Sequence, residues 1–393
     1  MLKGKVVVLG ITGSIAAHRA VDLASKLVQA GASVDVVMTP AATEFVTPLT
    51  FRSLTQGSVI VDMFEGGLEH IELSRRADVV VVAPATATTM ARLAHGLAED
   101  MVSVTVLATK APVLVCPAMD SQMFENAATQ ANLETLRGRG MTIVGPEMGR
   151  LASGRMGLGR LADVETILGA IRYALGRGGD LAGRKVVVTA GGTREPIDPV
   201  RYVSNYSSGK MGYAIAEAAR DRGAEVVLVS APTALPTPYG VRLEPVQRAV
   251  EMRDAVVQEC RDAQALVMAA AVADYQPVAT AEQKMKRRAK TLRLELTRTP
   301  DILAEAGKGF VRVGFAAESE NLVANARRKL ESKGLDLIAA NDISGPETAF
   351  DADTNRVVIL DQAGGEERLP VMTKYEVAQR ILDRVVALLA KGS

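Results

Sequence analysis

Short runs of β-branched residues alternate with helix-period segments along the whole chain, and this alternation limits the fold more than any other feature. The opening run at 6–9 precedes a helical pattern over about 15–29, and further apolar runs occupy 34–38, 79–82 and 113–115. Near-continuous apolar strands suit a parallel sheet that is buried on both faces. The pattern therefore predicts right-handed strand–helix–strand units in an open α/β sheet.

The same pattern restarts in the second half of the chain. A turn-rich segment at 176–180 precedes a strand pattern at 185–191 that again ends in glycine. We therefore predict two α/β domains, residues 1–180 and 181–393. In the second domain, leucines alternate with charged residues over 292–296, which predicts a one-sided strand and an antiparallel excursion of the sheet.

The composition argues against nucleic-acid and membrane partners. The formal net charge is +1 and aromatic residues make up only 4%, so neither a basic surface nor a base-stacking platform is expected. No apolar run approaches the roughly 20 residues that span a bilayer. Cys116 and Cys260 lie far apart without metal-type spacing. This cysteine usage favours a reduced, cytoplasmic location.

The loop after the first strand has the composition of a phosphate site. Ligands of open α/β sheets bind at the carboxyl ends of the strands. Thr12, Gly13 and Ser14 lie between that strand and the next helix, where small residues let backbone N–H groups approach a phosphate. The loop is neither GxGxxG nor a Walker P-loop, so a mononucleotide fits better than a dinucleotide or ATP. A plain tight turn explains this loop equally well.

Two later loops and one histidine are further candidates in the first half. Ala85 and Thr86 belong to a loop of small and hydroxyl-bearing residues that suits a planar ring with a ribityl chain. Met119 and Asp120 follow another strand, where a helix cap and core packing are the simpler interpretation. His70 has the side chain best suited to a general base near neutral pH, although a lone histidine is more often structural.

The second half carries candidate anion and cation sites. The segment 203–212 places Ser and Gly before a helix, which is typical of an anion site. Asp274 ends a buried strand and could hold Mg2+, an ion that takes one or two carboxylates plus phosphate oxygens. The basic segment 284–290 is either a solvated loop or a triphosphate-binding loop. Lys329 and Lys333 share one helix face.

Taken in order, four segments of the first half resemble a known family. They look like the homo-oligomeric flavin-containing cysteine decarboxylases, and within them the phosphopantothenoylcysteine decarboxylase half of the bifunctional coenzyme A enzyme. The resemblance covers residues 1–175 and implies a flavodoxin-like open parallel sheet, an FMN cofactor and a homo-oligomer. The segments are GITGSIAAHRA, HIELSRRADVVVVAPATATTMARLAHGLAED, CPAMDSQMF and LASGRMGLGRL.

The resemblance also implies a chemistry and a set of residues. FMN would oxidise the thiol carbon to a thioaldehyde, so that the carboxylate lies β to a C=S group that accepts the electrons of decarboxylation. His70 would be the base of the oxidative step, Met119 and Asp120 would hold the substrate carboxylate, and 151–161 would form a mobile clamp with glycine hinges. The implied FMN-binding residues are Thr12, Gly13, Ser14, Thr39, Ala85 and Thr86.

Two residues depart from the family pattern. Asp120 stands where the family usually has Asn, and an ionised carboxylate there would repel the substrate carboxylate unless Asp120 is protonated or binds another group. Ser153 stands where the clamp often carries a Cys that donates the proton of the final reduction. Because a hydroxyl is a far weaker acid than a thiol, we expect Ser153 to relay a proton from water. Cys116 is the alternative donor, although inert packing suits it better.

The second half resembles the phosphopantothenate–cysteine ligase half of the same bifunctional enzyme, over about residues 183–391. This implies a Rossmann-like α/β ligase domain that activates the carboxylate of 4′-phosphopantothenate with CTP as an acyl cytidylate. Cysteine then displaces CMP. The segments that carry the resemblance are TAGGTREPIDPVRYVSNYSSGKMG, AAAVADYQP, KMKRRAK, TPDIL, VGFAAE and GLDLIAAND.

Individual roles follow from the same resemblance. Lys284 would offset the charge that grows on the phosphates, and Asn205 would hydrogen-bond the acyl carbonyl. Asp274 would bind the metal, and Arg201 would contact a substrate phosphate. The other implied nucleotide-contacting residues are Met268, Ala269, Ala270, Pro300, Asp301, Ile302, Leu303, Phe315, Lys329 and Lys333.

Two other interpretations come from different functional classes. One is a flavodoxin-like electron carrier joined to a dinucleotide-binding reductase, but no GxGxxG follows either first strand. The other is a regulatory subunit that binds flavin without catalysis, which Asp120 and Ser153 allow for the first half only. On the favoured interpretation the partners are 4′-phosphopantothenate and cysteine, with no nucleic acid and no membrane.

Overall fold

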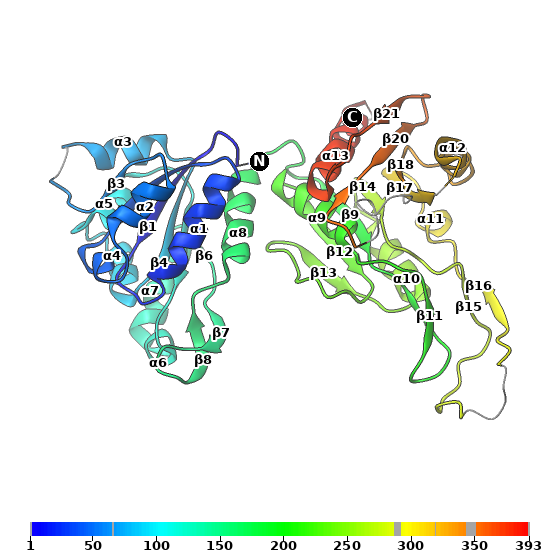
Figure 1. The fold of residues 1–393 in the computed structure, drawn as a ribbon, viewed down its shortest axis with the longest axis horizontal. Helices are drawn as coiled ribbons and strands as arrows, with labels where there is room; N and C mark the ends of the chain where they lie inside the picture. The colour runs from blue at the N-terminus through cyan, green and yellow to red at the C-terminus, as the bar shows by residue number, and fades with distance from the viewer. Residues whose placement is uncertain (1, 65–66, 287–291, 319, 343–350, 392–393) are drawn as a thin grey trace. The chain divides into compact units, whose positions relative to one another are not determined.

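The computed structural model describes residues 2–64, 67–286, 292–318, 320–342 and 351–391. The chain divides into two compact units, residues 1–175 and 176–393, each built around its own sheet (Figure 1). Residues 287–290 of the predicted basic segment lie outside the described residues. Among the described helices, none combines the length and the apolar character needed to cross a membrane.

The first unit contains a six-stranded parallel sheet. Its strands are β1 Val6–Ile11, β2 Ser33–Met38, β3 Val59–Ile60, β4 Val79–Ala85, β5 Val113–Pro117 and β6 Thr142–Ile143. They lie in the order β3–β2–β1–β4–β5–β6, and every neighbouring pair is parallel. All residues of β4 are buried, and since alternate side chains point to opposite faces, both faces of the sheet are covered. The predicted open parallel sheet is therefore confirmed.

The helices of this unit bury one face against the sheet. Helix α1 buries residues at helical spacing from Ala17 to Leu27 and leaves polar residues outside. Ion pairs join it to the start of α8, from Arg19 to Asp163, the residue before that helix, at 2.7 Å and from Lys26 to Glu165 at 2.6 Å. The two helices lie side by side in Figure 1. The helices are α1 Ala17–Gln29, η1 Pro40–Glu44, α2 Pro48–Leu54, α3 Glu69–Arg76, α4 Ala87–His95, α5 Met101–Ala108, α6 Ser121–Glu125, α7 Ala127–Gly138 and α8 Val164–Gly176, and a hairpin of β7 Glu147–Arg150 and β8 Met156–Arg160 precedes α8.

The second unit contains an eight-stranded mixed sheet. Its strands are β13 Arg242–Pro245, β12 Glu225–Ser230, β9 Lys185–Ala190, β14 Ala265–Met268, β17 Val311–Glu318, β18 Leu337–Asp342, β20 Val357–Asp361 and β21 Glu366–Arg368, given in their order across the sheet. The pairs from β13 to β18 are parallel, and β20 and β21 are antiparallel additions. The remaining elements are β10 Arg194–Pro196, β11 Tyr202–Ser204, α9 Lys210–Asp221, α10 Ala249–Glu259, β15 Tyr275–Pro277, β16 Leu296–Arg298, α11 Ile302–Glu305, α12 Leu322–Ser332, β19 Thr354–Asn355, β22 Met372–Thr373 and α13 Lys374–Lys391.

The predicted antiparallel excursion exists, but its predicted location was wrong. The leucines of 292–296 do not form a half-buried strand, because Leu292, Leu294 and Leu296 are all exposed. Only the last residue of this segment belongs to a strand, because Leu296 begins β16. This strand pairs with β15 in a separate two-stranded ribbon that extends away from the main sheet (Figure 1). The alternation of leucines with charged residues therefore does not mark a strand with one face in the core.

Helix α9 packs closely on the second sheet. At Gly212 an added Cβ would lie 2.6 Å from the Cβ of Ala190 and 2.7 Å from the carbonyl oxygen of Thr189. A larger residue would push α9 away from β9, so glycine is required by the short helix–strand distance. The position of this helix matters because its N-terminus opens onto the carboxyl edge of the sheet.

A buried polar network joins α9 to α13. Arg220 and Asp221 are 1% and 0% exposed and form an ion pair at 2.6 Å. The Arg220 guanidinium also donates to the carbonyl of Tyr239 at 2.7 Å, and the Tyr375 hydroxyl donates to Asp221 at 2.6 Å. Removal of one partner from a buried ion pair leaves the other charge without compensation.

We predict that Asp221→Ala destabilises the second unit by about 3–5 kcal/mol, because it leaves the Arg220 guanidinium buried and uncompensated. Native-state hydrogen exchange of α9 and α13 in the full chain measures this loss. Asp262→Ala is the matched control, since this carboxylate pairs with Lys185 but is 70% exposed, and it should leave that protection nearly unchanged. Equal effects of the two substitutions would contradict the importance of the buried network.

Candidate functional sites

A buried threonine connects two loops at the carboxyl edge of the first sheet. Thr12 follows β1 and is fully buried. Its hydroxyl donates to the carbonyl of Pro84 at 2.7 Å and accepts from the backbone N–H of Thr86 at 3.1 Å. Two of the predicted flavin-binding residues are thus brought together, and the side chain of Thr12 holds the loops in place.

The rest of this edge fits a phosphate group. The Thr39 N–H donates to the carbonyl of Ile11 at 3.0 Å, which places the second loop beside the first. A Cβ added to Gly13 would lie 2.6 Å from the Cβ of Ala41, so only glycine lets these loops meet. Helix α1 begins here without a side-chain cap. The small residues around its start leave room for an anion such as the phosphate of FMN.

Asp120 and Ser153 are hydrogen-bonded to each other. Asp120 is the N-cap of α6, where it accepts from the N–H of Gln122 at 3.1 Å, and its other oxygen accepts from the Ser153 hydroxyl at 2.8 Å. The Ser153 hydroxyl, the Gln122 N–H and the nearby Arg155 guanidinium hold the pKa of Asp120 below its usual value. The lowered pKa favours an ionised Asp120 near neutral pH rather than a protonated one.

The β7–β8 hairpin lies where the clamp was expected. The N–H of Met119 donates to the carbonyl of Gly159 at 3.0 Å, and a Cβ on Gly159 would lie 2.2 Å from the Met119 carbonyl oxygen. The hairpin is thus fixed on the Met119 loop at one end. Its turn, at 151–155, carries Ser153 onto Asp120.

Two other expected residues of the first unit occupy different surroundings. His70 is half-buried in the first turn of α3, and within the described part of the chain no hydrogen bond joins it to Asp120 or Ser153. Cys116 is fully buried in β5, and burial raises the pKa of its thiol. A buried thiol with a raised pKa is a poor proton donor to a ligand, which agrees with inert packing.

Threonines also hold the carboxyl edge of the second sheet. Thr189 and Thr193, at and beyond the end of β9, are fully buried. Their hydroxyls accept from the N–H of Ala270 at 3.1 Å and of Ala273 at 2.9 Å, respectively. The loop after β14, which carries Asp274, is thereby fixed beside the loop after β9.

A large cavity opens at this edge, and we call it the ligase cavity after the activity that the resemblance implies for this unit. Its volume is about 1020 Å³, and it gathers residues from the ends of β14 and β17, from α9, α11 and α12, and from the loop before α9. Among the predicted second-unit site residues, Arg201 and Lys284 are outside its described lining. The predicted residues that line it are Asn205, Met268, Ala269, Ala270, Asp274, Pro300, Asp301, Ile302, Leu303, Phe315, Lys329 and Lys333.

The charges of the ligase cavity are held by protein contacts. Lys329 donates to the carbonyl of Phe315 at 2.7 Å, and Lys333 pairs with Asp301 at 2.5 Å. Burial raises the pKa of Asp301, but the hydrogen bonds from Lys333 and the Ala304 N–H outweigh it, so the net effect is a lowered pKa. The Asn205 amide donates to the carbonyl of Val272 at 3.0 Å, next to the Asp274 loop.

Arg201 anchors the segment that contains Lys284. The Arg201 guanidinium pairs with Asp198 at 3.2 Å and donates to the carbonyl of Met285 at 3.1 Å. The buried Asp198 carboxylate also accepts from the N–H of Met285 at 3.1 Å. Lys284 itself is exposed. The described contacts of Arg201 are therefore with protein groups. Together with Asp198 it fixes Met285, the residue that follows Lys284.

The cavity also contains two lysines that the sequence analysis did not select. Lys210 begins α9 and pairs with Asp353 at 2.7 Å, and the buried Lys374 begins α13 and donates to the carbonyl of Ala352. Burial, followed by the charge of Lys210, lowers the pKa of Lys374. A lysine in the first turn of a helix is unfavourable for the helix dipole, and that signal could have drawn attention to both.

Asp274 is the one predicted metal ligand of this cavity. Asp274 is exposed on the cavity wall. No group of three or more His, Cys, Asp and Glu side chains that could hold a metal ion occurs in the described ranges of the chain. Mg2+ is commonly bound through one carboxylate together with substrate phosphates and water, so a single aspartate is sufficient for that mode of binding.

Known proteins resemble the chain over its whole length. The Flavoprotein family model matches residues 1–176, and the model described as the DNA/pantothenate metabolism flavoprotein C-terminal domain matches residues 181–389. The coenzyme A biosynthesis bifunctional protein CoaBC of Bacillus subtilis is 44% identical, over 99% of this chain and 98% of its own. The protein of the same name from Escherichia coli K12 is 44% identical, over 98% and 97%.

Among solved structures, the C-terminal domain of a CoaBC protein is 40% identical and covers 54% of this chain and 99% of its own, with a TM-score of 0.47. The full-length identities to the curated relatives are high enough to define a family. The chain therefore belongs to the family of bifunctional coenzyme A biosynthesis proteins.

Proposed function

We propose that the chain carries out two consecutive steps of coenzyme A biosynthesis. The second unit ligates cysteine to 4′-phosphopantothenate with CTP, and the first unit decarboxylates the product, 4′-phosphopantothenoylcysteine, to 4′-phosphopantetheine with FMN. The observation that carries the proposal is the ligase cavity, which gathers residues expected for nucleotide binding from segments far apart in the chain. The match of the first unit to the Flavoprotein family supports the other half. We place this activity in a cytoplasmic homo-oligomer.

In the ligase step, the charged groups of the cavity would bind the nucleotide. Lys329 and Lys333 line the cavity on the side of β17 and α11, and Asp274 would hold Mg2+ on the phosphates. The carboxylate oxygen of 4′-phosphopantothenate attacks the α-phosphorus of CTP, and pyrophosphate leaves. The amine of cysteine then bonds to the acyl carbon, the bond from that carbon to the phosphate oxygen breaks, CMP leaves with the electron pair, and the nitrogen loses a proton to water.

In the decarboxylation step, FMN would supply the redox chemistry when bound, because it can accept a hydride from the substrate and later return it. The protein would bind its phosphate at the start of α1 and hold the loops of Thr12 and Thr86 around it. The Met119 loop and the β7–β8 hairpin would enclose the substrate. His70 is our proposed base. Ser153 would relay the final proton, and the Asp120 carboxylate orients its hydroxyl.

One assay tests the ligase and decarboxylase together. The full-length protein is incubated with CTP, Mg2+, cysteine and 4′-phosphopantothenate, and the products are identified by mass spectrometry. We expect pyrophosphate, CMP and 4′-phosphopantetheine, with CO2 released. Formation of none of these products by well-folded protein would refute the proposed function, whereas 4′-phosphopantothenoylcysteine alone would restrict it to the second unit.

We predict that Thr12→Val lowers the FMN content of the purified protein and weakens FMN binding about tenfold. The substitution leaves the carbonyl of Pro84 and the N–H of Thr86 without their buried partner, so the two loops separate. Fluorescence titration of the flavin-free protein with FMN measures the affinity. Thr135→Val, at an exposed position of α7, is the matched control and should bind FMN normally. Unchanged binding by the Thr12 variant would remove this threonine from the site.

We predict that Lys284→Gln slows pyrophosphate release by at least about a hundredfold, while Asn205→Asp retains it and blocks amide formation. A cation is required for the phosphate charge, and a neutral amide is required at the acyl intermediate. Each half-reaction is measured separately, by pyrophosphate detection and by mass spectrometry of the amide. The decarboxylation of added 4′-phosphopantothenoylcysteine should be unaffected in both variants, and equal loss of both half-reactions would contradict the assignment.

We predict that Asp120→Asn lowers the KM for 4′-phosphopantothenoylcysteine by about fivefold, because it removes an ionised carboxylate that faces the substrate carboxylate. Steady-state CO2 release gives the KM. Gln122→Ala is the control, since the N–H of this residue, rather than its side chain, contacts Asp120. A higher KM in the Asn variant would mean that the negative charge contributes to binding through a positively charged group.

A further inference from the structure

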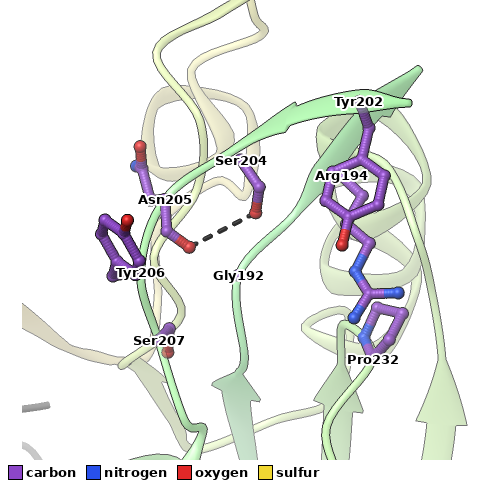
Figure 2. A pocket seen from close by; sticks show the side chains of 8 residues that line it. All are labelled: Gly192, Arg194, Tyr202, Ser204, Asn205, Tyr206, Ser207 and Pro232. Carbon is purple, nitrogen blue, oxygen red and sulfur yellow. Dashed lines mark hydrogen bonds between the residues drawn. The ribbon is translucent and has the colours of Figure 1, made fainter. Parts of the chain in front are cut away.

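A second, smaller pocket borders the ligase cavity. Its volume is about 390 Å³. Residues 205–207 line both spaces and form the wall between them. A molecule in the small pocket would therefore lie next to the acyl group that we place at Asn205. The lining residues, drawn in Figure 2, are Gly192, Arg194, Tyr202, Ser204, Asn205, Tyr206, Ser207 and Pro232.

Arg194 gives this pocket its chemical character, because it is the only charged residue of the described lining. The guanidinium is half-buried and lies 4.9 Å from the centre of the Tyr202 ring, so a cation–π contact holds it in place. The nearby carboxylates pair with other cations, Glu195 with Arg248 at 3.8 Å and Asp198 with Arg201 at 3.2 Å. Within the described ranges, no carboxylate pairs with Arg194, so its guanidinium is suited to an anionic group of a ligand.

The opposite side of the pocket offers neutral acceptors. Figure 2 shows the chain at 204–207 facing Arg194 and Tyr202, with the Ser204 hydroxyl directed to the carbonyl of Asn205 at 3.3 Å. The hydroxyl of Ser207 belongs to the same wall. These oxygens can accept hydrogen bonds from an amine. Because no acid is among the described lining, no ion pair there favours the charged ammonium form, and the positive charge of Arg194 disfavours it; an amine must be neutral to act as a nucleophile.

We propose that this pocket binds the amino acid substrate of the ligase, with its α-carboxylate on Arg194 and its amine at the wall formed by 205–207. This inference rests on the proposed ligase function and adds the site of its second substrate. A single guanidinium matches a carboxylate with one negative charge, whereas a phosphate dianion is usually held by more than one cation or by a helix N-terminus. From this wall the amine faces the acyl carbon in the ligase cavity.

The test compares cysteine with cysteamine, which has the same amine and thiol but no carboxylate. Wild-type enzyme should have a KM for cysteine about tenfold or more below that for cysteamine. Arg194→Gln should raise the KM for cysteine by about tenfold or more, leave the KM for cysteamine unchanged, and so abolish the preference. Arg194→Lys keeps the positive charge but lacks the planar guanidinium with its paired donors, so it should give an intermediate KM for cysteine.

Pyrophosphate release from CTP and 4′-phosphopantothenate is measured in the same variants and should be unchanged. This readout, together with the thermal unfolding temperature, separates loss of the subsite from misfolding. Arg261→Gln, an exposed arginine beyond α10, is the matched control and should keep the preference for cysteine. If Arg194→Gln does not fold, the same comparison is made with Arg194→Lys and with Tyr202→Leu. The Tyr202 variant removes the ring that contacts the guanidinium.

Three outcomes would overturn the inference. Retention of the cysteine preference by folded Arg194→Gln would show that another group binds the carboxylate. A raised KM for 4′-phosphopantothenate with an unchanged KM for cysteine would assign the pocket to the other acid. Failure of wild-type enzyme to release pyrophosphate would refute the ligase function itself, and that result is distinct because it appears before any amino acid is added.

Discussion

Buried threonine hydroxyls hold the functional edges of both sheets together. Thr12 accepts from the N–H of Thr86, and Thr193 accepts from the N–H of Ala273, each across the loops of two neighbouring parallel strands. A loop at the end of a buried strand has backbone groups without sheet partners, and leaving such a group unpaired and buried is costly. The hydroxyl supplies the partner and fixes the distance between loops. The edge at which we propose that the first unit binds phosphate and the ligase cavity of the second both depend on this kind of contact.

Much of the fold could be predicted because buried parallel strands leave a strong apolar signal in the sequence. The runs that become β1, β2, β4 and β9 were recognisable for that reason. The segment 292–296 was misplaced because leucine alternation is the same whether the strand faces a core or solvent, and only the tertiary contacts distinguish the two. A short addition such as β21, with three residues, is too short for a periodic signal.

The candidate sites were partly predictable for a related reason. Resemblance and strand ends identified the segments that supply most of the ligase-cavity lining. Lys210 lies in one of these segments without being named as a site residue, and Lys374 begins a helix outside them. The contact between Asp120 and Ser153 joins residues 33 positions apart, so no local pattern reveals it. It changes the chemistry of the decarboxylase site, because an ionised Asp120 can accept a hydrogen bond from the serine but cannot donate one to a substrate carboxylate.

We propose that each sheet binds its own ligand at its own carboxyl edge. Hydrogen exchange of the full-length, FMN-loaded protein, measured with and without CTP and Mg2+, tests this most directly. The account predicts that the nucleotide slows exchange in the second unit around 207–212 and 300–303, and leaves 10–15 and 85–88 unchanged. Protection confined to the first unit, or no protection at a saturating concentration of CTP, would contradict it.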